Sequence, residues 1–335
     1  MEFAPLLRRL LAGEHLDQAA SAELIGEVMD GALTPVRAGG LLVALAAKGE
    51  AVSEVVGAAR AMRERSLHVA HGLPMVADIV GTGGDGANTI NISTMAALVV
   101  AAVGVPVAKH GNRAASSACG SADVLEACGL SLDVSPDVAS RMLCGAGFTF
   151  MFAPAYHPAM RNVAPVRREL GIRTIFNVLG PLTNPASATH QVVGVARPEL
   201  LELVGDTLRG LGVRAGAVVH GSGGIDEVSG CGTTQVYSFD EGGTRHWSID
   251  PSAFHLDVPL EAVVGGSIQA CKDAFLAILG GEHSGRADVV ALNAALALHV
   301  CGRASTLDEA FELARATLRE GAALRTFAHA VEVAR

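Results

Sequence analysis

Four glycines stand among the six residues that open the stretch GTGGDGANTINIST, residues 81–94, directly after the apolar run MVADIV. Gly81, Gly83 and Gly86 match the G-x-G-x-x-G spacing of a dinucleotide-binding turn. Because glycine has no side chain, such a loop lets backbone N–H groups approach a phosphate closely. The stretch therefore predicts a phosphate site and leaves open which phosphate compound it binds.

The glycine loop departs from a nicotinamide or flavin site in two ways. In such a site the helix begins within the glycine motif, but here Ser93 or Thr94 is the first credible N-cap, about seven residues later. Roughly 20 residues on, where that fold has an acidic residue for the ribose hydroxyls, this chain has Lys109 and His110. A P-loop is excluded as well, because no Gly-Lys-Ser/Thr follows the glycines.

What remains is a loop at the end of a strand, rich in backbone N–H donors, that would hold a large anion. Asn91, Ser93 and Thr94 add polar side chains beside the N-terminus of the next helix, whose dipole favours negative charge. The structural alternative, a plain connecting loop, stays open at this point.

A second polar cluster, AKHGNRAASSACGSAD at residues 108–123, follows the next predicted strand. In a parallel sheet it would border the same crevice as the glycine loop, since the carboxyl ends of the strands share one edge. As structural alternatives, His110 could be a core residue and Arg113 a surface ion-pair partner, although two phosphate-binding loops at consecutive strand ends argue against both. The polar side chains of the cluster are Lys109, His110, Asn112, Arg113, Ser116, Ser117 and Ser121.

Several arginines lie in AYHPAMRNVAPVRRELGIRTIFNVLGPLTNP, residues 155–185. Arg161, Arg167 and Arg168 spread over more than one face of a predicted helix. One arginine that faces a pocket could bind a carboxylate through two hydrogen bonds, and the others would be surface or salt-bridge residues. The segment NVLGPLTNP, punctuated by glycine and prolines, is suited to form a rigid apolar wall.

Asp226 and Glu227 are adjacent in HGSGGIDEVSG, residues 220–230, again directly after a predicted strand. Adjacent acidic residues are usually solvated. At a strand end opposite phosphate-binding loops they become candidate ligands for Mg²⁺, which prefers a few carboxylates together with substrate oxygens.

The elements that must position these residues change character near residue 75. Residues 1–70 predict helices only: Thr34 and Pro35 begin one that ends at Gly49, and Ser53 is the expected N-cap of the next. Apolar stripes are predicted at Leu6, Leu7, Leu10 and Leu11 in the first of these helices and at Leu41, Leu42 and Leu45 in a later one.

From residue 75, short β-rich runs alternate with helices. The predicted strands are MVADIV, VPVAKHG, FTFMF, HQVVGV, AGAVVHG and TQVYSF, and a helix is expected from about Thr94 to Val103. The pattern predicts an α/β fold in two domains. Residues 1–72 form a small all-helical domain, to which about 165–185 could add helices. Residues 73–335 form a larger α/β domain with a mainly parallel central sheet flanked by helices.

Composition narrows the class of protein. A net charge of −9 over 335 residues argues against a binder of nucleic acid or of anionic membranes, and a 50% hydrophobic content allows a large core. The six cysteines form no C-x-x-C pair and are interpreted as reduced, mostly buried thiols. Without a signal-peptide core or a convincing membrane span, the expected location is the cytoplasm.

Together the four polar segments closely resemble the anthranilate phosphoribosyltransferase family, which has the nucleoside phosphorylase/phosphoribosyltransferase fold. The matching motifs, in the family's order, are GTGGD with NIST, KHGNR with GSADVLE, YHPAM with VRRELGIRTIFN and LGPL, and GIDE. The resemblance covers essentially the whole chain. It implies transfer of the phosphoribosyl group of 5-phosphoribosyl 1-pyrophosphate to the amine of anthranilate, in tryptophan biosynthesis. It also implies two Mg²⁺ per subunit and a homodimer formed through the helical domain.

The resemblance also assigns site residues, none of them as a general acid or base; catalysis would come from positioning and charge stabilisation. It assigns phosphoribosyl pyrophosphate to Gly81, Gly83, Gly84, Asp85, Thr89, Asn91, Ser93, Thr94, Lys109 and Ser121. It assigns anthranilate to Gly81, His110, Asn112, His157, Arg167 and Pro181, with Arg167 facing the carboxylate, and the metals to Ser93, Asp226 and Glu227. Ala118 and Arg161 depart from the family's usual residues and receive no role.

Two alternatives belong to the same fold family. Pyrimidine nucleoside phosphorylases have a similar glycine loop and a KHG-like segment, but they are typically longer, with a C-terminal region that this chain lacks. A nucleic-acid-binding paralogue would carry a basic groove and would have lost site residues, whereas this chain is acidic and keeps them.

Overall fold

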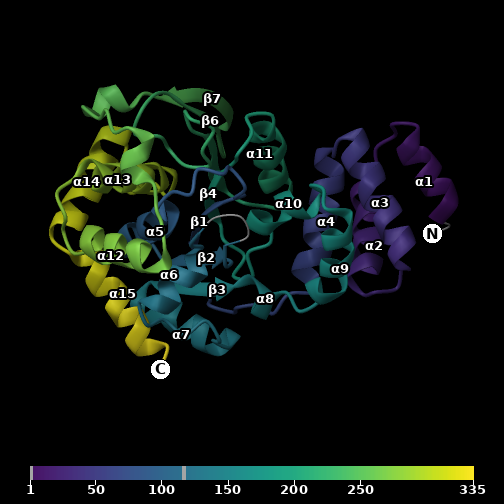
Figure 1. Ribbon diagram of the computed structural model, residues 1–335, viewed down its shortest axis with the longest axis horizontal. Coiled ribbons are helices and arrows are strands. Elements are labelled where there is room, and N and C mark those ends of the chain that lie inside the picture. The colour runs from purple at the N-terminus through teal and green to yellow at the C-terminus, as the bar shows by residue number, and fades with distance from the viewer. Residues whose placement is uncertain (1–2, 115–117) are drawn as a thin grey trace.

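Four helices open the computed structural model, which describes residues 3–114 and 118–335; Ser116 and Ser117 lie outside the described residues. These helices are α1 (Phe3–Leu11), α2 (Gln18–Met29), α3 (Pro35–Lys48) and α4 (Val52–Glu64), and they form one end of the molecule together with α9 (Met160–Leu170) (Figure 1). The boundary between residues 72 and 73 stays a prediction.

The caps of these helices follow the sequence in part. The Thr34 hydroxyl accepts a hydrogen bond from the Arg37 N–H, and the helix ends at Gly49, as predicted. Ser53 is not the cap of α4, because the Glu54 carboxylate accepts the Ala51 N–H at 2.8 Å and the helix begins one residue before Ser53. The apolar stripe of α3 is buried as predicted, whereas in α1 Leu6 and Leu10 are buried and Leu11 is 71% exposed.

The rest of the molecule is built around a seven-stranded sheet with the order β3-β2-β1-β4-β5-β6-β7. The strands are β1 (Ala77–Gly81), β2 (Val107–Gly111), β3 (Phe148–Phe152), β4 (His190–Gly194), β5 (Ala215–His220), β6 (Thr234–Asp240) and β7 (Gly243–Ile249). The first five run parallel, and β6 and β7 add an antiparallel edge. The predicted α/β fold with a mainly parallel sheet is confirmed; β7, which has few buried side chains, was not predicted.

Helices cover the sheet and connect its strands (Figure 1). The α-helices are α5 (Ile92–Ala102), α6 (Ser121–Ala127), α7 (Pro136–Ala146), α8 (Ala153–Tyr156), α10 (Phe176–Leu179), α11 (Leu200–Gly210), α12 (Ile268–Leu279), α13 (Gly285–Val300), α14 (Leu307–Arg319) and α15 (Ala322–Val333). Short 3₁₀ turns are η1 (Gly180–Leu182), η2 (Pro251–Phe254) and η3 (Leu260–Val263).

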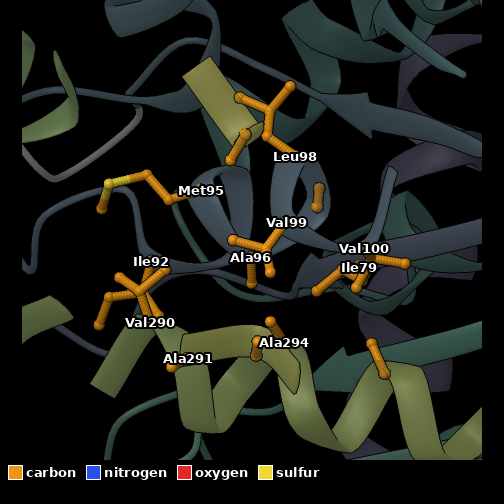
Figure 2. Packing of buried hydrophobic residues seen from close by; sticks show 14 of the residues in the cluster. Ile79, Ile92, Met95, Ala96, Leu98, Val99, Val100, Val290, Ala291 and Ala294 are labelled. Atoms are coloured by element: carbon orange, nitrogen blue, oxygen red, sulfur yellow. The ribbon is translucent and has the colours of Figure 1, made fainter. Parts of the chain in front are cut away.

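Helix α5 is apolar on every side and lies in the middle of the core. Figure 2 shows Ala96 and Val99 of α5 above Ala291 and Ala294 of α13, all of them buried. A helix that is hydrophobic all round is stable only when it is buried on all sides, and the small alanines allow the two helices to approach closely. This packing fixes the N-terminus of α5, which begins at Ile92, two residues before the predicted Thr94.

Candidate active site

The carboxyl ends of β1 and β4 meet at the point where the order of the strands reverses. In an open α/β sheet this switch point is where ligands bind. Gly81 and Gly194 are register partners there, and the Asp226 segment passes directly over both. A Cβ on Gly81 would collide with the Asp226 carboxylate and a Cβ on Gly194 with the Asp226 backbone, so the two bare positions make room for Asp226 at the centre of the sheet edge.

A cavity of about 850 Å³ opens over this edge, and Met62 of α4 contributes to its wall. All of the residues assigned from the sequence lie in its lining: Gly81, Gly83, Gly84, Asp85, Thr89, Asn91, Ser93, Thr94, Lys109, His110, Asn112, Ser121, His157, Arg167, Pro181, Asp226 and Glu227. The structure thus brings the four polar segments together; which ligand each residue binds stays a prediction.

The glycine loop has the backbone conformation that only glycine adopts easily. Gly83, Gly84 and Gly86 have φ of 65°, 75° and 76°, in the left-handed region where a side chain is strained. Beyond the loop, Ile90 N–H donates to Val263 O at 2.8 Å. This pairing anchors the loop to the segment that precedes α12.

Asp226 and Glu227 project toward the glycine loop and α5. Asp226 Oδ2 accepts the Gly83 N–H at 2.7 Å, and Glu227 Oε1 accepts the Ser93 N–H at 3.0 Å. Burial, followed by repulsion from Asp85, raises the pKa of Asp226 to about 7, and burial and the neighbouring Asp226 raise that of Glu227 to about 8. Buried carboxylates that repel each other are stabilised by a cation.

The same carboxylates fit Mg²⁺ better than a metal held by protein ligands alone. Within residues 3–114 and 118–335, no group of three or more His, Cys, Asp or Glu side chains gathers around one point. Mg²⁺ is commonly held by one or two carboxylates together with phosphate oxygens and water. Asp226, Glu227 and the Ser93 hydroxyl are a donor set of this kind.

Lys109 lies beneath these carboxylates and is only 2% exposed. Its Nζ donates to Ile79 O and, at 3.4 Å, to Ser93 Oγ. Burial lowers its pKa, and the nearby Asp78 and Glu227 carboxylates oppose that shift. Lys109 is therefore a buried amino group held next to the start of α5.

His110 and His157 form a pair of buried rings whose centroids lie 5.0 Å apart. Burial lowers the pKa of His110 to about 3 and that of His157 to about 4, so both rings are neutral near pH 7. His110 Nδ1 lies 3.0 Å from Gly180 O, which can only accept, so the proton resides on Nδ1 and Nε2 is an acceptor. Neither His110 Nε2 nor either nitrogen of His157 has a hydrogen-bond partner among the described residues.

The arginines divide into those that face the cavity and those that do not. Arg167 lines the cavity with its guanidinium 5.8 Å from the centre of the Phe176 ring, and burial lowers its pKa. Arg168 is outside the lining. Arg113 also lies in the lining. Its guanidinium forms ion pairs with Asp123 at 2.9 Å and Glu126 at 2.8 Å, which is the structural role that the sequence had left open for it.

Sequence reasoning missed two residues that the structure places at or beneath the site. Arg173 lies in the lining, with its guanidinium packed over Gly84; only its position in the arginine-rich segment pointed to it. Asp78 is wholly buried in β1 and accepts hydrogen bonds from the His110 N–H and from Asn184; a single acidic residue within an apolar strand was the only signal for it.

The cysteine thiols are less buried than the sequence predicted. All six cysteines are free, but only Cys119, Cys271 and Cys301 are buried, and Cys144 is exposed. In the described ranges, 3–114 and 118–335, each helix is too short or too polar to cross a bilayer.

Comparison with known proteins agrees with this geometry. Residues 73–324 match the α/β domain model of a glycosyl transferase family, and residues 4–66 match its helical bundle domain. The anthranilate phosphoribosyltransferase of Symbiobacterium thermophilum is 46% identical over 321 residues, which cover 96% of this chain and 94% of that protein.

Two solved structures give the same result for the fold. Anthranilate phosphoribosyltransferase from Thermus thermophilus superposes with a TM-score of 0.93 at 44% identity, covering 98% of this chain and 99% of that one. The enzyme from Saccharomyces cerevisiae, in complex with PRPP and Mg, superposes with a TM-score of 0.88 at 26% identity, covering 99% of this chain and 97% of that one.

Proposed function

The chain belongs to the anthranilate phosphoribosyltransferase family, and we propose that the cavity over its sheet edge is where it carries out the family's reaction. It transfers the phosphoribosyl group of 5-phosphoribosyl 1-pyrophosphate to the amine of anthranilate, a reaction of tryptophan biosynthesis. The bond from the anomeric carbon to pyrophosphate breaks, the carbon–nitrogen bond forms, and the amine loses a proton. This membership favours transfer over the alternative of nucleoside phosphorolysis.

The phosphoribosyl pyrophosphate subsite lies between the glycine loop and the start of α5. The loop offers backbone N–H groups, α5 offers the positive end of its dipole, and Lys109 adds a buried positive charge. Donors fixed before the reaction stabilise the charge that develops on the leaving pyrophosphate without having to reorganise. The placement of Lys109 under this edge is the observation that supports the subsite most directly.

Asp226, Glu227 and Ser93 would hold Mg²⁺, with two ions per subunit. The donor set fits, because the two carboxylates are partly buried, lie next to each other and face the phosphate loop. When bound, the metal supplies positive charge to the phosphate oxygens. In the protein alone, the Gly83 and Ser93 N–H groups orient the carboxylates toward that position.

The anthranilate subsite lies on the other side of the cavity. Arg167 forms no ion pair within the described part of the chain, so its guanidinium is free to bind the substrate carboxylate. The unpaired nitrogens of His110 and His157, with Pro181 and Asn112, form the wall around the ring. The aromatic amine arrives neutral, so holding it in line with the anomeric carbon supplies much of the rate enhancement.

Arg173 extends the cation set toward the phosphate side. Its guanidinium lies over Gly84, where a Cβ would be 3.5 Å from Nη1. Like Arg167, it has no ion-pair partner in the described chain. A planar guanidinium next to a phosphate loop is suited to a bidentate contact with a phosphate, so Arg173 would bind the pyrophosphate group.

The helical end of the molecule would form a homodimer. Leu11 on α1 is 71% exposed, and Val36 and Val43 on the adjacent α3 are 85% and 40% exposed. An exposed apolar patch of this kind indicates an interaction surface. The cytoplasm is the proposed location, and small molecules rather than nucleic acid are the proposed partners, in keeping with the net charge of −9.

Loss of anthranilate fluorescence on mixing with 5-phosphoribosyl 1-pyrophosphate and Mg²⁺ tests the activity directly. We expect turnover that requires all three components. Thymidine with inorganic phosphate is the parallel assay for the nucleoside phosphorylase alternative. Phosphorolysis without anthranilate consumption would overturn the assignment.

A further inference from the structure

Asp78 is a wholly buried carboxylate in β1 that lies beneath the cavity and outside its lining. Its register partner in β4 is Gln191. Burial raises its pKa to about 6, although the charge of Lys109 and the hydrogen bond from Asn184 oppose the shift. Burial of a carboxylate costs free energy, so a wholly buried one is unusual unless it forms hydrogen bonds or ion pairs that fix its neighbours.

The two oxygens of Asp78 bind two different parts of the site. Oδ1 accepts the backbone N–H of His110 at 3.3 Å, at the end of β2. Oδ2 accepts from Asn184 Nδ2 at 2.7 Å, and Asn184 Nδ2 also donates to Ala108 O at 2.7 Å. One carboxylate therefore ties the end of β2 to the loop that contains Asn184.

That loop forms the wall of the proposed anthranilate subsite. His110 Nδ1 hydrogen bonds to Gly180 O at 3.0 Å, and Gln191 Nε2 donates to Pro181 O at 3.0 Å. The tautomer of His110 and the position of Pro181 thus depend on a loop that Asn184 and Asp78 hold against the sheet.

We propose that Asp78 is a positioning residue for the transfer reaction: through its bond to the His110 backbone and through Asn184, it holds His110 and Pro181 in the proposed anthranilate subsite. It touches neither substrate and acts only through these neighbours. The proposal rests on the proposed function, because the anthranilate subsite is defined by it.

The substitution Asp78→Asn keeps the shape of the side chain but leaves one acceptor oxygen where the carboxylate has two. It therefore breaks the bond to either the His110 N–H or Asn184. We expect the KM for anthranilate to rise about tenfold, while the KM for 5-phosphoribosyl 1-pyrophosphate and the Mg²⁺ concentration for half-maximal rate stay as in the wild type.

Asn184→Ala removes the partner through which Asp78 holds the loop. It is the variant to measure if Asp78→Asn does not fold. It removes the tie to the loop and leaves the Asp78 charge in place. We expect the KM for anthranilate to rise about tenfold while the Mg²⁺ dependence stays as in the wild type. Equal changes in all constants would overturn the proposal.

A purely structural role predicts a different outcome. In that case Asp78→Asn would lower the melting temperature. At temperatures where the variant is still folded, kcat, both KM values and the Mg²⁺ dependence would be unchanged, and the proposal would be wrong. The wild-type rate is measured in parallel. Absent wild-type transfer contradicts the proposed function, whereas normal wild-type transfer with unchanged Asp78→Asn kinetics contradicts only the role of Asp78.

Discussion

The backbone N–H of Ser93, in the first turn of α5, donates a hydrogen bond to Glu227 Oε1 at 3.0 Å. The two residues are far apart in the sequence and come from different strand ends. The Asn91 side chain makes no capping bond to the helix, so a carboxylate from another segment satisfies one of the free N–H groups at the helix start. The helix terminus and the proposed metal site are therefore one structural unit.

Neutralising both carboxylates of this unit should abolish metal-dependent turnover. In Asp226→Asn together with Glu227→Gln, the site loses the negative charge that a cation requires, and we expect kcat to fall at least about 100-fold. Initial rates measured across a range of Mg²⁺ concentrations check this. The melting temperature should not fall, because the two partly buried carboxylates repel each other. Near-normal activity at low Mg²⁺ would refute the metal site.

Arg167→Ala should affect one substrate far more than the other. Loss of a charge-assisted contact with the carboxylate should raise the KM for anthranilate roughly 10- to 100-fold, with little change in the KM for 5-phosphoribosyl 1-pyrophosphate. Steady-state kinetics with each substrate varied in turn measures both constants. Equal increases in the two would remove the role assigned to Arg167.

Arg173→Ala should show the opposite selectivity. Its guanidinium lies over Gly84 on the phosphate side, so we expect the KM for 5-phosphoribosyl 1-pyrophosphate to rise about tenfold, and product inhibition by pyrophosphate to weaken with it. Arg168→Ala is the matched control, since Arg168 lies on the neighbouring helix outside the cavity lining. A phenotype that the two variants share would indicate a general charge effect.

The sequence predicted the strand ends and the polar loops well, because these signals are local. A glycine-rich loop after an apolar run, or an Asp-Glu pair after a strand, marks the carboxyl edge of a parallel sheet wherever it occurs. Since such strands must share one edge, four separate motifs could be placed around one cavity before any contact was known.

The missed features depend on partners that are distant in the sequence. Asp78 gains its role from Asn184, more than 100 positions away, and nothing near it reports that contact. Ser53 has the residue type of an N-cap, but the Glu54 carboxylate accepts the Ala51 N–H and starts the helix earlier. Leu11 fits the apolar stripe of α1 but lies beyond the surface that α3 covers, at 71% exposure.

That exposure leads to a prediction about assembly. If the α1 and α3 surface forms the homodimer, a charge at its centre should weaken association. We expect Val36→Glu with Leu11→Glu to weaken dimerisation at least about tenfold, seen as a shift to the monomer mass in size-exclusion chromatography with light scattering. Ile268→Glu, at a residue 44% exposed on the distant α12, is the matched control. A wild-type monomer at all concentrations would contradict the dimer.

The buried histidines predict how stability responds to acid. The pKa values of His110 and His157 in the folded protein, about 3 and about 4, lie below the value near 6.5 that is typical of an unfolded chain. The unfolded state therefore binds protons first as the pH falls. The stability that the neutral rings contribute is present above about pH 6.5 and is lost as the pH falls from there toward 4.

His157→Gln should make the protein less sensitive to acid over this range. Between pH 7.5 and pH 5, removal of one such histidine should reduce the loss in free energy of unfolding by about 2 kcal/mol. Asp78 and Glu227 have raised pKa values and change stability in the opposite direction, but both proteins contain them, so their effect cancels in the comparison. Urea unfolding at the two pH values measures the difference. His329→Gln, at an exposed position on α15, is the control, and an equal effect of the two substitutions would show that burial of His157 is not the cause.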